Sequence, residues 1–169
     1  FLNISEVSAK ELRLIIDQAK TRKLNRVNFN KSSPDTDKPF EGKSMVMIFE
    51  KPSTRTRISF DIAIKQLGGS TITLNPDGIH YGKGDESIKD TSKVLSEYSD
   101  LIMIRTSNHK NLEEFAKYSS VPIINGLSEN SHPCQILSDI LTFEEFKGDI
   151  KGKTIACLGD GNNNMSNSL

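Results

Sequence analysis

The segment Ser53 to Arg57 gathers hydroxyl and guanidinium side chains directly after the apolar run Met45 to Phe49. The pattern predicts a turn into a helix, with Ser53 as its cap. The first N–H groups of a helix lack backbone partners and the helix dipole places positive charge there, so a phosphate group fits this position. The side chains that add donors are Ser53, Thr54, Arg55 and Thr56. We therefore interpret the segment as an anion site.

An ordinary capped helix with exposed arginines would also match this segment. Serine and threonine caps are common, but such a density of donors around Arg55 is not, and this favours the anion site. Arg57 adds a second cation, although it can instead pair with a carboxylate in a purely structural role.

Two further polar clusters follow predicted strands. Arg105-Thr106 comes directly after the apolar run Leu101 to Ile104, so Arg105 is expected to point into a crevice. A rim arginine in a surface ion pair fits equally well. His132-Pro133-Cys134-Gln135 lies at a predicted helix start, where imidazole and carboxamide groups can hydrogen-bond a carbonyl compound. A capping or solvated histidine is an equally good interpretation of His132.

Two glycine-containing segments resemble nucleotide-binding loops only superficially. Residues 159–164 read Gly-Asp-Gly-Asn-Asn-Asn, so Asn164 stands where a dinucleotide loop has its third glycine. Gly42-Lys43-Ser44 ends like a P-loop, but Asp37 occupies the leading glycine position and a strand follows the segment instead of preceding it. Neither segment is interpreted as a nucleotide site.

The elements that must position these clusters alternate along the chain. Helical spacing predicts helices at 8–24, 55–67, 88–98, 112–118 and 133–146, and apolar runs predict strands at 45–49, 71–74, 101–104, 121–124 and 154–158. Polar loops are expected at 25–42 and 75–85. This alternation is typical of an α/β fold, a parallel sheet flanked by helices on both faces. Such folds bind ligands at the carboxyl ends of their strands, where the polar clusters lie.

Composition and charge argue against several other classes of protein. The 169 residues include 22 basic and 22 acidic ones, so neither nucleic acid nor a membrane surface is an expected partner. The apolar runs are too short to span a membrane, and Cys134 and Cys157 indicate neither a disulfide framework nor a zinc site. A cytoplasmic location is expected. The chain opens at Phe1 and stops at Leu169 just after a strand-turn pattern, which suggests a piece of a longer protein.

Together the clusters resemble the aspartate/ornithine carbamoyltransferase family. The segments that carry the resemblance are Phe49 to Arg57, Arg105-Thr106 and His132-Pro133-Cys134-Gln135, in matching order and spacing. The ornithine branch is the most similar one. The segments behind that choice are Met103 to Thr106, Asn125-Gly126-Leu127-Ser128 and Gly159 to Asn163. The aspartate branch typically has Arg-His in place of Arg105-Thr106.

The resemblance implies a reaction in which the δ-amine of ornithine attacks carbamoyl phosphate to give citrulline and phosphate. By position in the family motif, the phosphate ligands would be Ser53, Thr54, Arg55 and Thr56. Arg105 and His132 would stabilise the carbonyl oxygen in the transition state, with Arg55 as a third catalytic residue. Gln135 and the backbone around Pro133 and Cys134 would hold the carbamoyl amino group, and Asn164 would contact ornithine. The resemblance implies no metal, no organic cofactor and no covalent intermediate, so Cys134 is not expected to be a nucleophile.

The same resemblance implies a domain division and an assembly. Residues 1–148 would form the carbamoyl-phosphate-binding domain and 149–169 the start of an ornithine-binding domain, with its first strand at 154–158. Family members form trimers, and His80 would reach the site of a neighbouring subunit, with Lys83 as a further source of charge. Because family chains are about twice as long, this chain alone is not expected to convert ornithine. Arginine biosynthesis or the arginine deiminase pathway would be its setting.

Two alternatives stay open at this point. Another carbamoyltransferase, acting on aspartate, putrescine or acetylornithine, would carry a similar first half. A non-catalytic phosphate-binding remnant of a split gene would also retain the phosphate turn, but it would not need Arg105, His132 and Gln135.

Overall fold

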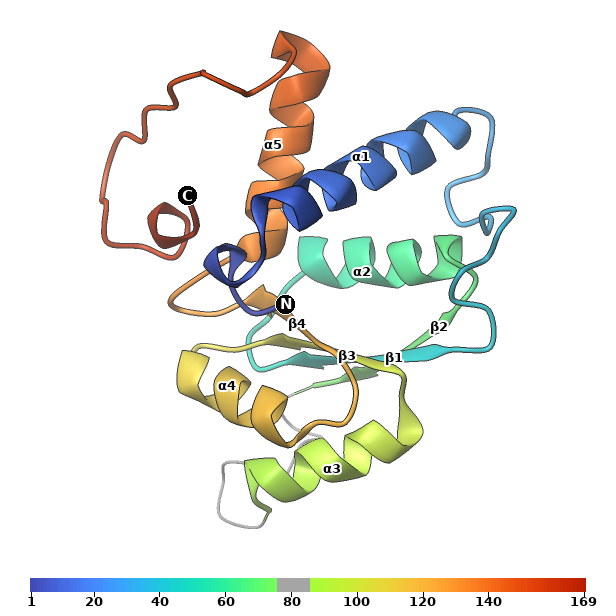
Figure 1. Cartoon of the computed structure of the whole chain (residues 1–169). Helices are drawn as coiled ribbons and strands as arrows, with labels where there is room; N and C mark the ends of the chain where they lie inside the picture. Colours follow the sequence, from blue (N-terminus) through green and yellow to red (C-terminus); the bar gives the residue numbers. More distant parts are fainter. Residues whose placement is uncertain (76–85) are drawn as a thin grey trace.

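A four-stranded parallel sheet lies at the centre of the computed structural model, which describes residues 1–75 and 86–169 (Figure 1). Its strands are β1 (Ser44–Phe49), β2 (Ser70–Leu74), β3 (Leu101–Arg105) and β4 (Ile123–Leu127). They are ordered β2-β1-β3-β4, and each neighbouring pair is parallel.

Helices cover both faces of this sheet. The helices are α1 (Ala9–Asn25), α2 (Arg55–Gln66), α3 (Ile88–Tyr98), α4 (His109–Tyr118) and α5 (Pro133–Lys147), with the short 3-10 helices η1 (Ile4–Glu6) and η3 (Ser166–Ser168). Figure 1 shows α3 and α4 on one face and α1, α2 and α5 on the other. The predicted α/β class is thereby confirmed. Among the described helices, none has the length and apolar character needed to cross a membrane.

The two central strands supply the core on both faces. Met45 to Phe49 of β1 are all buried, as the continuous apolar run predicts for a strand covered on both sides. Alternate side chains point to opposite faces. Val46 and Ile48 pack in one buried cluster with residues of α4, while Met45, Met47 and Phe49 pack in a second cluster against Ile64 of α2.

The strand order creates a crevice at the carboxyl ends of β1 and β3. From β1 the chain passes through α2 to β2 on one side, and then through α3 to β3 on the other side of β1. Connections that diverge from two neighbouring strands leave a gap in which α/β folds bind ligands. Phe49 pairs with Arg105 across this end of the sheet, so the residues that follow β1 lie beside Arg105.

Two element boundaries differ by three residues from those predicted from the sequence. β4 runs to Leu127 instead of stopping at Ile124, because Asn125 and Gly126 are buried within it. A Cβ on Gly126 would lie 2.3 Å from the sulfur of Met103, so a larger residue here would force the buried Met103 side chain to move. α4 begins at His109 instead of residue 112, because the side chain of Asn108 accepts the N–H of Lys110 and caps the helix.

The strand predicted at 154–158 does not form within the described residues. This segment is exposed, and the Leu158 side chain lies 95% exposed. A strand is stable only when a neighbouring strand satisfies its backbone groups, and no second strand occurs from 149 to 169, all of which the structure describes. The apolar run alone predicted the strand without identifying a partner for it.

Candidate functional site

A hollow of about 1040 Å³ lies at the carboxyl ends of β1, β3 and β4. It is lined by three segments that the sequence singled out separately: the turn from Pro52 to Thr56, Arg105, and the start of α5 with His132, Cys134 and Gln135. Residues far apart in the sequence therefore meet at the crevice predicted from the fold class.

The turn between β1 and α2 presents its hydroxyl groups without using them for capping. α2 begins at Arg55, and Thr54 occupies the cap position with helical backbone angles and no side-chain cap bond. The prediction that Ser53 caps the helix is therefore wrong, because the helix begins one residue later than that role requires. Neither the Ser53 nor the Thr54 hydroxyl bonds to any described residue, so both remain able to bind an anion at the positive end of α2.

Two arginines in this hollow lack carboxylate partners among the described residues. Arg55 is exposed and forms no ion pair there. Arg105 donates from Nη1 to Thr56 Oγ1 at 3.0 Å, while its buried Nε has no hydrogen-bond partner in the described part of the chain. Burial, and then the nearby charge of Arg55, lower the pKa of Arg105. Two cations that repel each other and lack counterions favour a ligand with two negative charges.

His132 lies at the start of α5 with its ring turned toward this positive region. Burial lowers the pKa of its imidazole, the charge of Arg105 lowers it further, and Asp139 acts in the opposite direction. The ring is therefore neutral at pH 7, and a neutral imidazole can donate one hydrogen bond. Its Nδ1 is buried and has no partner in the described residues.

The side chain of Gln135 is oriented by a carboxylate one helical turn later. Gln135 Nε2 donates to Asp139 Oδ1 at 2.8 Å. Since a carboxylate only accepts, the amide nitrogen must face Asp139, and the amide oxygen of Gln135 is left as an acceptor. An acceptor in this place suits a ligand that carries an N–H group.

Cys134 has the properties of a packed thiol and not of a nucleophile. Its sulfur donates to the backbone oxygen of Asn125 at 3.6 Å. Burial raises the pKa of this thiol to about 11, so almost no thiolate exists at pH 7. The neighbouring Pro133 is buried in the first turn of α5, where proline is favoured.

Arg57 does not point into the hollow. Its Nη2 donates to Asn75 Oδ1 at 2.7 Å, and its guanidinium stacks over the ring of Phe49 at 4.8 Å. Arg57 therefore joins the start of α2 to the end of β2. This is a structural role, but its partner is the amide of Asn75 and not the carboxylate that the sequence analysis considered.

Asn164 lies beside the hollow and not in its lining. Asn164 donates from Nδ2 to the backbone oxygen of Ser128 at 3.0 Å, next to the hollow, whose lining includes its neighbour Met165. Its contact with an amine substrate stays a prediction. His80 and Lys83 fall in 76–85, outside the described residues.

Sequence reasoning missed several residues of the hollow. Ser59 and Asp139 both line it, each one helical turn after a predicted residue, Thr56 and Gln135. Helical spacing could have identified both. Glu50 lies outside the lining; it accepts a hydrogen bond from the Thr106 hydroxyl, a contact that depends on the pairing of β1 with β3. No group of three or more His, Cys, Asp or Glu side chains suited to a metal ion occurs among the residues described.

Comparison with known proteins gives a consistent result. A family profile described as "Aspartate/ornithine carbamoyltransferase, carbamoyl-P binding domain" matches residues 1–145. An ornithine carbamoyltransferase of Rhizobium meliloti is 53% identical over 163 residues, which are 96% of this chain and 52% of that protein. A second, from Ruegeria pomeroyi, is 48% identical over 100% of this chain and 54% of its own length. The chain thus spans about half the length of the curated relatives it matches.

Solved structures agree with the sequence relatives. Ornithine carbamoyltransferase from Pyrococcus furiosus superimposes with a TM-score of 0.92 and 45% identity, over 99% of this chain and 51% of that one. An N-acetyl-L-ornithine transcarbamylase mutant superimposes with a TM-score of 0.77 and 32% identity, over 90% of this chain and 50% of that one.

Proposed function

This chain belongs to the aspartate/ornithine carbamoyltransferase family through its carbamoyl-phosphate-binding domain, and from that premise we propose that it binds carbamoyl phosphate and forms the first half of an ornithine carbamoyltransferase. The observation that carries the proposal is the pair Arg55 and Arg105, which share one hollow without a carboxylate partner among the described residues. A phosphoryl dianion would supply the missing negative charge.

The phosphate would bind at the positive end of α2. The hydroxyls of Ser53 and Thr54 make no competing bonds to described residues, and Arg55 lies beside them. Thr56 already contacts Arg105 at 3.0 Å, which places the guanidinium of Arg105 next to the phosphate turn. One guanidinium could then bridge the phosphate and the carbamoyl carbonyl oxygen.

The carbamoyl group would extend from the phosphate toward α5. Arg105 and the neutral ring of His132 would donate to its carbonyl oxygen, and the free amide oxygen of Gln135 would accept from its amino group. When the δ-amine of ornithine attacks, a C–N bond forms and negative charge develops on the carbonyl oxygen. Donors already aimed at that oxygen lower the barrier. The C–O bond to phosphate then breaks, the amine loses a proton, and citrulline and phosphate leave.

Residues 149–169 belong, in this proposal, to the start of the ornithine-binding domain. Support comes from the family profile, which ends at residue 145, and from the exposure of apolar residues such as Ile155 and Leu158. Asn164 would contact ornithine from this segment. The chain alone is then not expected to convert ornithine, and citrulline production by the isolated 169 residues would contradict this part of the proposal.

Assembly into a homotrimer, with His80 entering a neighbouring site, is part of the same proposal. Exposed apolar side chains on α2 and on the edge strand β2, Ile58 at 58% and Ile72 at 48%, give it support. Sedimentation equilibrium of the full-length enzyme tests it, and a monomer at micromolar concentration would contradict it. The cytoplasm is the proposed location.

Calorimetric titration tests the binding proposal directly. Phosphonoacetamide is a stable analogue of carbamoyl phosphate that keeps both the phosphoryl and the amide end. The chain should bind it more tightly than inorganic phosphate, because only the analogue also reaches His132 and Gln135. Equal affinity for the two would leave a phosphate-binding module as the better conclusion. Citrulline formation by the full-length enzyme, with aspartate, putrescine and acetylornithine as competing amines, tests the substrate.

A further inference from the structure

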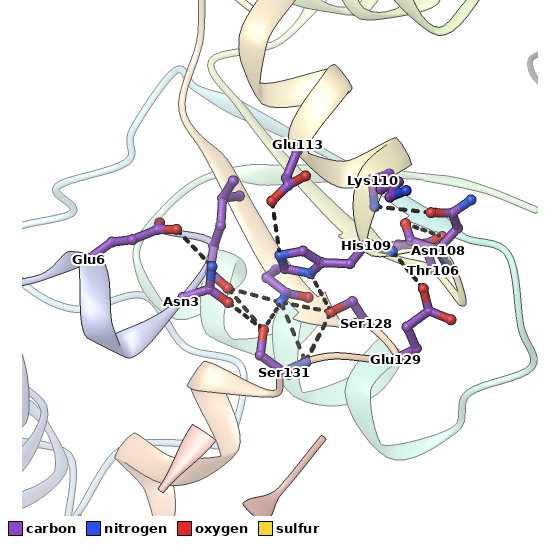
Figure 2. A network of polar contacts seen from close by, with 12 residues as sticks. Asn3, Glu6, Thr106, Asn108, His109, Lys110, Glu113, Ser128, Glu129 and Ser131 are labelled. Atoms are coloured by element: carbon purple, nitrogen blue, oxygen red, sulfur yellow. Dashed lines mark hydrogen bonds and ion pairs between the residues drawn. The ribbon is translucent and has the colours of Figure 1, made fainter. Parts of the chain in front are cut away.

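His109 lies buried in the first turn of α4, 5% exposed, and its ring faces the turn that leads to His132. Figure 2 shows this ring between Ser128 on one side and Glu113 on the other. His109 Nδ1 lies 2.7 Å from Ser128 Oγ, and the backbone N–H of His109 donates to Glu129 Oε1 at 3.3 Å. The start of α4 therefore contacts two consecutive residues of this turn.

The hydrogen bonds around Ser128 indicate which acceptor its hydroxyl proton faces. Its hydroxyl oxygen accepts the backbone N–H of Ser131 at 3.2 Å. As a donor, the hydroxyl has two acceptors within reach, His109 Nδ1 at 2.7 Å and the backbone oxygen of Ser131 at 3.4 Å, and the shorter contact assigns its proton to His109 Nδ1. The ring proton then sits on Nε2, which faces Glu113 Oε1 at 3.7 Å.

In space, Ser128, His109 and Glu113 follow one another as do the serine, histidine and acid of a catalytic triad. Ser128 is fully buried, at 0% exposure, so no substrate reaches its oxygen. The three side chains therefore have a structural role and not a role as a nucleophile with its base and acid. The contact between His109 and Ser128 can then affect a ligand only through a residue that the 128–131 turn positions.

That turn holds His132. Ser131 directly precedes it, and the Ser131 hydroxyl is itself bonded to Asn125 Nδ2 at 2.9 Å and to Asn3 Oδ1 at 2.7 Å. The ring of His132 makes no hydrogen bond to any residue in the described part of the chain. The backbone of His132 therefore places its ring in the hollow. Two features hold that backbone: the buried turn before it, and a hydrogen bond from the His132 N–H to Ser168 Oγ at 2.8 Å.

We propose that His109 is a positioning residue for His132, acting through the Ser128 hydroxyl and the 128–131 turn. The inference rests on the proposed function, because His132 matters only if the hollow binds a carbonyl compound. The phosphate turn lies between β1 and α2, and among the described residues it has no hydrogen bond to His109, Ser128 or Ser131. Loss of the His109 contact should therefore weaken binding of the carbamoyl end and spare binding of the phosphate end.

Two amide substitutions separate this role from a loss of packing. In His109→Asn the amide oxygen can replace Nδ1 as the acceptor for Ser128, whereas the longer Gln side chain in His109→Gln places its polar atoms near Nε2. The ratio of affinities for phosphonoacetamide and inorganic phosphate should fall about fivefold in His109→Gln, the value of one hydrogen bond, and stay close to the original in His109→Asn. Glu113→Gln, on the opposite side of the ring, is the matched control. Its amide oxygen can still accept from Nε2 and the contact with Ser128 is untouched, so the ratio should stay unchanged.

A second measurement does not depend on binding. The chain has three histidines, so imidazole NMR signals are readily assigned after single substitutions. The His132 signals should shift in His109→Gln and in Ser128→Ala and remain in place in Glu113→Gln. Ser128→Ala also serves if His109→Gln does not fold, because it removes the other partner of the same hydrogen bond, the Ser128 hydroxyl, with a smaller change in volume.

The outcomes are distinguishable. If the unsubstituted chain shows no preference for phosphonoacetamide, the proposed function fails, and the NMR signals of His132 still decide whether His109 positions that ring. If folded His109→Gln and Ser128→Ala keep both the affinity ratio and the His132 signals, the positioning role is refuted. An equal loss of affinity for both ligands would indicate a general structural role and would refute it as well.

Discussion

Two hollows of the molecule each contain a pair of arginines, yet the arginines have opposite surroundings. The hollow of about 760 Å³ beside the carboxyl end of α1 contains Arg22 and Arg26, and both bind Asp35. The hollow at the ends of β1 and β3 contains Arg55 and Arg105, and neither binds a carboxylate among the described residues. Paired arginines stabilise the chain, and unpaired ones are available to a ligand. The positions of the carboxylates, and not the number of arginines, therefore indicate whether a hollow can bind an anion.

The largest effect on stability is expected at the paired hollow. Asp35→Ala leaves Arg22 and Arg26 without the carboxylate they share, which is only 10% exposed, so we expect a loss of about 3 kcal/mol in the free energy of unfolding. Urea denaturation followed by circular dichroism measures it. Asp37→Ala is the control, since the Asp37 side chain is 61% exposed and its removal should change the free energy of unfolding much less. Phosphonoacetamide affinity should not change in either variant.

The largest effect on binding is expected at the unpaired hollow. Arg55→Met removes a charged donor from the phosphate turn and should weaken phosphonoacetamide binding about a hundredfold, as for loss of a charged hydrogen bond of about 3 kcal/mol. The unfolding midpoint should not fall, because Arg55 makes no ion pair with the described residues and repels Arg105. Lys51→Met, in the same loop but outside the lining, is the control. Equal losses in the two variants would mean that only net charge matters.

A second paired carboxylate should make stability depend on pH. Glu144 of α5 is buried between Arg13 and Lys20 of α1. The hydrogen bonds from Arg13 lower its pKa from the ordinary value of 4.5 to about 2. The stabilisation is fully present above pH 4.5 and is lost as the pH falls toward about 2. Glu144→Gln should flatten this part of the pH–stability curve. An unchanged slope in that variant would assign the acid sensitivity to other carboxylates.

The smallest effect is expected in the titration of His132. Burial and Arg105 lower its pKa below the ordinary value of 6.5 in the free chain. A bound dianion would offset the charge of Arg105, so the pKa of His132 should rise when phosphonoacetamide is added. NMR titration of the imidazole signals measures this. A pKa that stays constant or falls on binding would show that the ligand does not lie beside this ring.

Much of the site was accessible from local patterns. The phosphate turn, Arg105 and the start of α5 were identified because each follows an apolar run, and α/β folds bring strand ends together. The same patterns predicted a strand at 154–158 that does not form, because an apolar run does not reveal whether a neighbouring strand exists to pair with it.

The sequence by itself determined the fold class, the family and the donors at the ends of the strands, since these depend on short runs and fixed spacings. Only the tertiary structure decided which arginines are paired, because carboxylates such as Asp35 reach them through contacts that no local pattern encodes. It also decided that Arg57 turns away to Asn75, and that His109 meets Ser128 beneath the His132 turn. Charge neutralisation and buried hydrogen bonds depend on distances in space, and those are determined by packing of the whole chain.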